Sequence, residues 1–356
     1  MILKQDGSVW STAITLHGGL VPFRGVNKRF APIITSGGIA VAAGTGFSLA
    51  LTQDGSVWAM GRNYRGQLGD GTTARRDTFL FVQVIPGAKT VYAGGSHTMV
   101  LTDSGSIWAT GGNNYGQLGD GLTAKTTRFF IAMSNGAKAA ALGDTHSIVL
   151  KYDGSVWATG RNLHGQLGDG TKGDCSNFVK VVTSGAAGVY AGSSHSMVIK
   201  EDGSVWATGW NEYGQLGDGS AIDRVNYVKV VLGGAKTVAA GRRHSMMLKQ
   251  DGSVWATGHN AYGQLGAAWA ANIVQVFVQV ISDGARAVAA GAFHSMMLKE
   301  DGSVWATGSN KAGQFGDGST KSENQFVRLV QFSNGSRHER THVHTECVLC
   351  TFSSSS

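Results

Sequence analysis

The stretch Asp251-Gly-Ser-Val-Trp255, followed by Ala256-Thr-Gly258 and then by Tyr262-Gly-Gln-Leu-Gly266, recurs along the chain and decides its fold. Asp-Gly-Ser-Val-Trp begins at Asp6, Asp54, Asp153, Asp202, Asp251 and Asp301, and a variant begins at Ser104. The tryptophans that end these copies are 48 to 50 residues apart: Trp10, Trp58, Trp108, Trp157, Trp206, Trp255 and Trp305. A period in this range, kept with almost no insertions, indicates supersecondary units that are stacked or arranged in a ring.

Each unit carries four segments that favour β-strands. In the copy that ends at Trp255 these are Tyr227–Val231, Lys236–Ala240, His244–Lys249 and Ser253–Thr257, which we group into one unit. Asp251-Gly252 is a two-residue hairpin signal, since both residues tolerate positive φ. No unit has room for a helix of about 10 to 12 residues. The sequence therefore predicts an all-β fold, a seven-bladed β-propeller of four-stranded antiparallel blades, in which the repeated tryptophan packs within each blade.

The two ends of the chain are predicted to close the ring. A His-Ser or His-Thr step precedes the hairpin at His97, His146, His195, His244 and His294, and Phe47 takes this position in the earliest copy. The chain begins too late to supply the step before Trp10, whereas His344-Thr345 follows His294 by 50 residues. We therefore expect Phe326–Val330 and the tail through Leu349 to supply the first strands of a blade whose last strands are Met1–Lys4 and Ser8–Trp10, because such pairing removes both open edges. Residues 1–349 would form one propeller, and the serine-rich residues 350–356 a disordered tail.

Composition narrows the classes of protein. The formal net charge is +7 and the pI is about 9.3, which permits an acidic partner, but Lys and Arg are spread without a dense basic run, so binding of nucleic acid is weakly supported. Three cysteines are too few for a disulfide framework, which favours a reducing compartment. The sequence contains neither an apolar signal core nor an apolar run of membrane-spanning length. We expect a monomeric, intracellular protein of the cytoplasm or nucleus that does not bind membranes.

The repeated pattern Asp-Gly-Ser-Val-Trp-Ala-Thr-Gly-x-Asn-x-Tyr-Gly-Gln-Leu-Gly-Asp-Gly, with Ala-Gly-x-x-His-Ser upstream, resembles the repeat of the regulator of chromosome condensation family. The resemblance covers nearly the whole chain and implies a seven-bladed propeller. The family includes a guanine-nucleotide exchange factor for the GTPase Ran and a plant UV-B photoreceptor. The regular spacing leaves no room for the inserted β-wedge of the exchange factor, and Gly241-Arg-Arg-His-Ser245 lacks the tryptophan of the photoreceptor's turn.

Several motifs suggest chemistry but are interpreted as structural. A catalytic group has no reason to recur in every blade, so the His-Ser steps are predicted to tether turns. The aspartate after Gly-Gln-Leu-Gly is predicted to form Asx-type turns. His338-Glu-Arg-Thr-His342 matches a zinc-protease string and Cys347-Val-Leu-Cys350 adds metal-binding types, but the protease motif requires a helix where the repeat predicts strand and turn. We expect no catalysis, no cofactor and no metal, although metal binding by the tail stays an alternative.

The direction of the strands places nearly all differences between units on one face, which we call the variable face. It carries the Gly-x-x-His turns and the segments around Tyr-Gly-Gln-Leu-Gly, while the Asp-Gly hairpins lie on the opposite face. Exposed Arg, Trp and Phe on rigidly held loops are favoured anchors in interfaces. The predicted partner-binding residues are Arg161, Trp210, Arg242, Arg243, His259, Trp269 and Phe293.

The sequence thus predicts a non-enzymatic interaction scaffold that binds a protein partner through its variable face. Paired arginines beside aromatic residues favour an acidic, partly apolar protein surface. A small GTPase is the partner that the resemblance implies, which makes guanine-nucleotide exchange the first alternative function. A chromatin-binding module is the second alternative.

Overall fold

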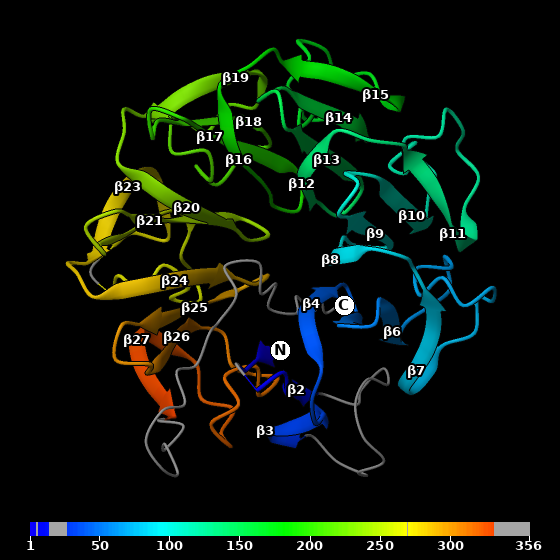
Figure 1. The fold of residues 1–356 in the computed structure, drawn as a ribbon. Helices are drawn as coiled ribbons and strands as arrows, with labels where there is room; N and C mark the ends of the chain where they lie inside the picture. Colours follow the sequence, from blue (N-terminus) through cyan, green and yellow to red (C-terminus); the bar gives the residue numbers. More distant parts are fainter. Residues whose placement is uncertain (5, 14–26, 269, 331–356) are drawn as a thin grey trace.

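The computed structural model describes residues 1–4, 6–13, 27–268 and 270–330. Over these residues the chain forms seven antiparallel sheets that are arranged in a ring as the blades of a propeller (Figure 1). Blades arranged in this way enclose a central channel. Six blades have four strands, and three strands of the first blade are described. The described part of the chain contains no helix that could cross a membrane. The predicted fold class, a seven-bladed all-β propeller, is confirmed.

The blades follow one another along the chain. The first contains β1 (Ile2–Leu3), β2 (Val9–Ala13) and β3 (Asn27–Ile34), and the second β4 (Gly38–Gly44), β5 (Phe47–Thr52), β6 (Ser56–Gly61) and β7 (Arg76–Val84). The third contains β8 (Ala88–Ala93), β9 (His97–Thr102), β10 (Ile107–Gly111) and β11 (Thr126–Met133), and the fourth β12 (Ala137–Leu142), β13 (His146–Lys151), β14 (Val156–Gly160) and β15 (Cys175–Val182). The fifth contains β16 (Ala186–Ala191), β17 (His195–Lys200), β18 (Val205–Gly209) and β19 (Arg224–Val231). The sixth contains β20 (Ala235–Ala240), β21 (His244–Lys249), β22 (Val254–His259) and β23 (Ile273–Ile281), and the seventh β24 (Ala285–Ala290), β25 (His294–Lys299), β26 (Val304–Gly308) and β27 (Glu323–Val330).

The grouping of strands into units corrects one part of the sequence interpretation. The segment Tyr227–Val231 was expected to open the unit that ends at Trp255, but it belongs to β19, which pairs with β18 of the preceding blade. Trp206 lies opposite Lys229 in that pairing. The loop after each tryptophan strand turns the chain back along the same strand, so the long segment becomes the outer strand of its own blade. Each of the six four-stranded blades therefore begins at the channel with an alanine-rich strand and ends at the rim (Figure 1).

The predicted closure is wrong for residues 326–330. They belong to β27, which pairs with the tryptophan strand β26 of the seventh blade rather than opening the closing blade. Met1–Lys4 and Ser8–Trp10 do contribute to a hairpin, in which Ile2 lies opposite Trp10. The remaining tail, through Leu349, lies outside the described residues.

The hydrophobic core lies between neighbouring blades. Leu49 and Leu51 of β5 pack in one cluster with Val91 and Val100 of the third blade, and similar clusters join each later pair of blades. The innermost strands approach one another closely because they consist largely of alanine, valine and glycine. The repeated tryptophans are only partly buried; Trp157, for example, packs beneath the ammonium groups of Lys151 and Lys180.

The recurring histidines join adjacent blades through hydrogen bonds. Nε2 of His97, His146, His195 and His244 lies 2.8 or 2.9 Å from the hydroxyl of Ser147, Ser196, Ser245 and Ser295, respectively, each in the next blade. These imidazoles are completely buried and each covers the glycine that starts its turn; a Cβ on Gly143 would lie 2.1 Å from Cε1 of His146. The predicted structural role of the His-Ser steps is confirmed, and the tether connects blades as well as turns.

Candidate functional site

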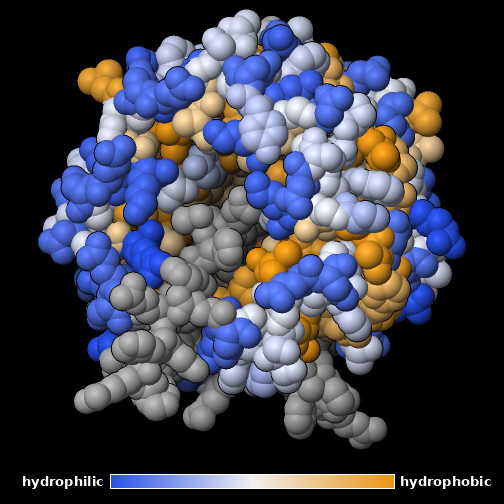
Figure 2. All heavy atoms as spheres, viewed as in Figure 1, coloured by the Kyte–Doolittle hydropathy of each residue, from blue (hydrophilic) through white to orange (hydrophobic). Residues whose placement is uncertain are grey.

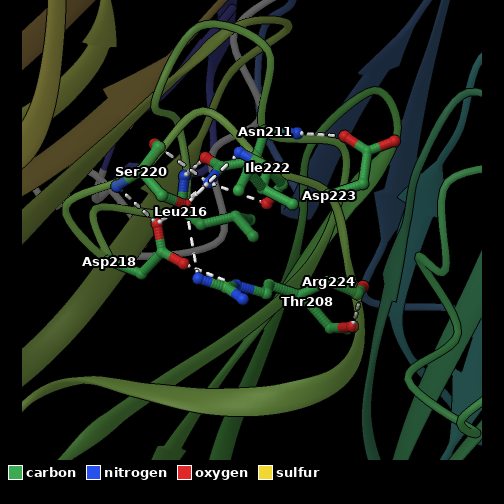
Figure 3. Close-up of polar contacts among 8 residues, drawn as sticks. All are labelled: Thr208, Asn211, Leu216, Asp218, Ser220, Ile222, Asp223 and Arg224. Carbon is green, nitrogen blue, oxygen red and sulfur yellow. Dashed lines mark hydrogen bonds and ion pairs between the residues drawn. The ribbon is translucent and has the colours of Figure 1, made fainter.

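The loops of the variable face are fixed by a buried asparagine, which the fifth blade shows clearly (Figure 3). Nδ2 of Asn211 donates to Oδ1 of Asp218 at 2.9 Å and to the carbonyl oxygens of Ser220 and Ile222. Oδ1 of Asn211 accepts the backbone N–H of Leu216, and the Asn211 N–H donates to the carboxylate of Asp223. Because one side chain bonds both arms of the loop, the residues that project from it are held in defined positions.

The aspartate that follows Gly-Gln-Leu-Gly has a second role beyond the predicted Asx turn. Asp218 accepts the N–H of Ser220, as an Asx turn requires, and its other oxygen lies 2.6 Å from Nε of Arg224 on the outer strand (Figure 3). Burial raises the pKa of Asp218, but hydrogen bonds from Ser220, Arg224 and Asn211 outweigh this effect and lower it. Asp70 and Arg76 form the equivalent pair in the second blade. These pairs fasten the loops to the rim, so these carboxylates are not available to a ligand.

Aromatic side chains form a continuous row across the variable face. His164 contacts Trp210, with ring centroids 5.6 Å apart, and Trp210 contacts Tyr213 at 5.3 Å. Tyr213 then contacts His259 at 5.0 Å, His259 contacts Tyr262 at 5.9 Å, and Tyr262 contacts Phe293 at 5.1 Å. We call these six residues the aromatic arc. It runs over the fourth to seventh blades. The residues before Gly-Gln-Leu-Gly in the fourth and fifth blades reach Trp210 and His259, at the end of the tryptophan strand of the next blade, and Tyr262 of the sixth blade reaches Phe293 in the Gly-x-x-His turn of the seventh.

Cations lie over the aromatic arc and beside it. The guanidinium of Arg243 lies 4.5 Å from the ring centroid of Tyr213 and 5.5 Å from that of Trp210, and that of Arg242 lies 5.7 Å from Phe293. The guanidinium of Arg161 lies 4.8 Å from the ring centroid of Tyr115, so the stacking of arginine on an aromatic ring continues to the third blade. The ion pairs found among the described residues include none of these three arginines, and Nε of Arg243 is buried there without a hydrogen-bond partner. Such stacked guanidinium groups keep donors available for an anionic ligand.

Two histidines of the arc are held by polar contacts as well. Nδ1 of His164 lies 2.8 Å from Oδ2 of Asp223, and Nδ1 of His259 lies 2.8 Å from Nε2 of Gln264. Burial, with a smaller contribution from the Arg243 charge, lowers the pKa of His259. The amide of Gln264 donates to Nδ1 of His259, because its oxygen already accepts the N–H of Tyr262. His259 is therefore a neutral member of the arc.

The two variable residues of each Gly-x-x-His turn occupy different surroundings. The first of them lines a hollow of about 260 Å³ at the mouth of the channel, which we call the channel-mouth hollow. The residues that take this first position and line the hollow are Thr45, Gly95, Asp144, Ser193, Arg242 and Ala292. The second residue instead faces the loops, as Arg243 and Phe293 show by their contacts with the aromatic arc. Figure 2 shows the ring hollowed at its centre, with hydrophilic and hydrophobic residues intermixed around it.

The predicted partner-binding residues separate into three groups. Trp210, Arg243, His259 and Phe293 meet in or over the aromatic arc, and Arg242 lies over Phe293 while it lines the channel-mouth hollow. Arg161 lies on the same face, stacked on Tyr115. Trp269 lies outside the described residues.

Sequence reasoning missed four aromatic residues that lie one position before Gly-Gln-Leu-Gly, namely Tyr115, His164, Tyr213 and Tyr262. In the repeat pattern this position belongs to the constant Tyr-Gly-Gln-Leu-Gly signature. The signal was the change at this position to Arg65 in the second blade and to Ala312 in the seventh, because a residue needed only for the fold has less reason to vary.

No group of three or more metal-binding side chains occurs within the described ranges. The predicted tail motif, His338 to His342 with Cys347 and Cys350, lies outside them. Cys175 is partly buried, and burial together with Asp169 raises the pKa of its thiol, which disfavours the reactive thiolate.

The fold and the residues of the variable face together define a class of protein. It is a seven-bladed propeller that presents variable loops with aromatic and cationic side chains on one side. The regulator of chromosome condensation (RCC1) repeat matches residues 39–67, 88–117, 137–166, 186–215, 235–264 and 285–314, and a second description of that repeat matches 54–101, 104–150, 153–199 and 202–248. The chain belongs to the RCC1-repeat family.

Solved structures share this fold at low sequence identity. Human WBSCR16 is 20% identical, with 97% of this chain and 96% of that chain covered and a TM-score of 0.80. Yeast RCC1 (Prp20) bound to Kap60 is 20% identical, with 94% and 86% covered and a TM-score of 0.81. The Saccharomyces cerevisiae Prp20p structure, whose description reports binding to Gsp1p and histones, is 19% identical, with 94% and 88% covered and a TM-score of 0.81. No curated protein sequence matches the chain.

Proposed function

We propose that this protein is a non-enzymatic interaction module that binds a protein partner through the variable face, with the aromatic arc at the centre of the interface. The observation that carries this proposal is the arc itself, with Arg242 and Arg243 stacked on it and free of ion pairs among the described residues. Interfaces concentrate their binding energy in Trp, Tyr and Arg held in well-packed surroundings.

The partner surface that fits is acidic and partly apolar. The stacked arginines offer planar donors that match carboxylates. Several large apolar side chains are exposed in other loops of the variable face, between the tryptophan strand and the outer strand, among them Tyr64 (63% exposed), Leu122 (61%) and Ile222 (64%). An anionic partner without apolar groups would leave these side chains in water, which favours a protein surface over a bare phosphate backbone.

Guanine-nucleotide exchange on a small GTPase is the second candidate. It is supported by the structural likeness to Prp20p, whose description names Gsp1p. We rank it below scaffolding because the six connections between tryptophan strand and outer strand are of nearly equal length, so none of these described loops carries an inserted wedge. Chromatin binding, which the same description supports through histones, has the weaker support of a dispersed positive charge.

The test is affinity capture with the isolated protein as bait, followed by mass spectrometry, in which wild type is compared with Arg242→Ala, Arg243→Ala. We expect the partner of the wild type to be lost or weakened by about 1–3 kcal/mol in the double variant, with a smaller dependence on salt. Lys138→Ala, Lys236→Ala is the matched control, because these exposed lysines begin innermost strands at the opposite end of the channel. Loss of the partner in the control alone would show that the opposite face binds.

A further inference from the structure

The channel-mouth hollow contains one acidic side chain among its described lining residues, Asp144. The hydroxyl of Ser193 donates to Oδ2 of Asp144. Arg242 also lines the hollow, yet its guanidinium lies over the ring of Phe293 and makes no ion pair with Asp144. The carboxylate therefore has acceptor capacity that the described side chains leave unused.

The walls of the hollow suit an aliphatic chain. The ends of the innermost strands supply Ala43, Ala93, Ala191, Ala240 and Ala290, together with the backbone of the glycines that follow them. A volume of about 260 Å³ is smaller than the roughly 300–1,000 Å³ of sites for drug-sized molecules. The space is suited to one long side chain whose polar end reaches Asp144.

The charges around the hollow have a definite order. Asp144 is the acidic group at the mouth, while Arg242, two turns further round the ring, and Arg243 and Arg161 on the loops are positive. Burial raises the pKa of Asp144, and the Ser193 hydrogen bond and the Arg242 charge oppose this rise. A cation placed on Asp144 would relieve the cost of burying this charge, and anions further out would meet the arginines.

We propose that the channel-mouth hollow receives a lysine side chain of the partner protein, with the lysine ammonium on the Asp144 carboxylate and acidic neighbours of that lysine on Arg242 and Arg243. This inference rests on the proposed function, because it assigns a segment of the partner to the centre of the same face. It names the chemistry of that segment as a lysine flanked by glutamate or aspartate.

The test uses two acetylated and amidated pentapeptides, Glu-Glu-Lys-Glu-Glu and Glu-Glu-norleucine-Glu-Glu, titrated calorimetrically into the full chain. We expect the lysine peptide to bind about tenfold more tightly than the norleucine peptide, the size of one charge-assisted hydrogen bond. Asp144→Asn should reduce this preference to within about twofold and leave the norleucine peptide unaffected. An asparagine keeps an oxygen for Ser193, so the turn should be retained, which a thermal melt verifies. Glu212→Gln removes an exposed carboxylate from the same face and should keep the preference.

Three results would overturn the inference: equal binding of both peptides to wild type, a preference for lysine that survives Asp144→Asn, or no binding of either peptide at millimolar concentration. If both peptides bind equally and Arg242→Ala, Arg243→Ala weakens both, the acidic partner on the variable face stands and only the lysine is wrong. If the arginine variant binds both peptides as wild type does, the proposed function fails as well.

Discussion

Nε2 of His146 lies 2.9 Å from Oγ of Ser196 across the boundary between the fourth and fifth blades. The serine hydroxyl donates its single proton to the carbonyl oxygen of Gln166 at 2.7 Å, so it must accept a hydrogen bond from the imidazole. His146 therefore carries its proton on Nε2, and Nδ1 is left buried without a partner. The same geometry holds for His195 and Ser245. The cationic form would also donate from Nε2, but it would bury a charge and leave an N–H on Nδ1 without an acceptor, so burial favours the neutral histidine.

We predict that the protein loses stability as the pH falls below about 6.5. Burial lowers the pKa of His97, His146 and His244 to about 3 and of His195 and His294 to about 4, from 6.5. The unfolded chain therefore binds more protons than the folded one between these values, so the stabilisation is complete above pH 6.5 and decreases below it. The contribution of each histidine to the free energy of unfolding should fall by about 2 kcal/mol between pH 7.5 and pH 5. Urea denaturation at the two pH values measures this, and equal free energies of unfolding would contradict it.

We predict that His146→Phe makes the free energy of unfolding less dependent on pH. Phe47 fills the equivalent position in the second blade and is also buried, so the site accepts this ring. At pH 7.5 the variant should be destabilised by about 1 kcal/mol through loss of the Ser196 hydrogen bond. At pH 5 it should be at least as stable as wild type, because one proton fewer is taken up on unfolding. The crossing of the two stability curves is the decisive observation; parallel curves would refute the role of His146.

We predict that Asn211→Ala loosens the loop of the fifth blade. The side chain is fully buried and bonds both arms of the loop, so its removal should cost about 2–3 kcal/mol of unfolding free energy and increase proteolytic cleavage between residues 212 and 223. Asn114→Ala makes the same change at an exposed asparagine in the corresponding loop of the third blade and should have little effect. Equal stability of the two variants would show that the asparagine does not hold the loop.

We predict that Gly209→Ala is more destabilising than Gly234→Ala. Both glycines have positive φ, 102° and 81°, so both variants strain the backbone. A Cβ at Gly209 would also lie 2.6 Å from the carbonyl oxygen of Ser194 and 2.8 Å from Cα of His195, whereas nothing lies within 4 Å at Gly234. Gly234→Ala should cost about 1 kcal/mol and Gly209→Ala at least about 2 kcal/mol more. Chemical denaturation of the matched pair measures the difference, and similar losses would refute the close packing at Gly209.

The fold followed from the sequence because seven tryptophans at constant spacing leave few alternatives. The sequence did not show which four strands form one blade. Consecutive strands are antiparallel throughout, so the repeat pattern looks the same wherever the boundary between two blades is placed. Only the pairing of Trp206 with Lys229 distinguishes an outer strand that closes a blade from a strand that opens one. This pairing depends on the loop fixed by Asn211, an asparagine that recurs at the same place in the repeat pattern but whose hydrogen bonds to both arms of the loop are not visible in the spacing.

The candidate site was predicted in part. Trp210, Arg243 and Phe293 were placed on one face from strand direction alone, and the contacts of the aromatic arc bring them together. The different surroundings of Arg242, at the channel mouth, and Arg243, on the loops, were not predictable from the sequence. They depend on how the chain turns at the end of the innermost strand. The place of Tyr213 in the aromatic arc depends on the distance between neighbouring blades, and the spacing of residues within one repeat does not contain this distance.

The alternation within the Gly-x-x-His turns has a consequence for how such a protein can diverge. Two adjacent codons specify residues with separate surroundings, one at the channel mouth, as Asp144, and one on the loops, as Phe293. Because the backbone of the turn is set by the glycine and the buried histidine on either side, each codon can change without disturbing the other. The described residues hold five such turns and a sixth that ends in Phe47, and thus twelve neighbouring positions that natural selection, or a protein engineer, can vary while the scaffold stays constant.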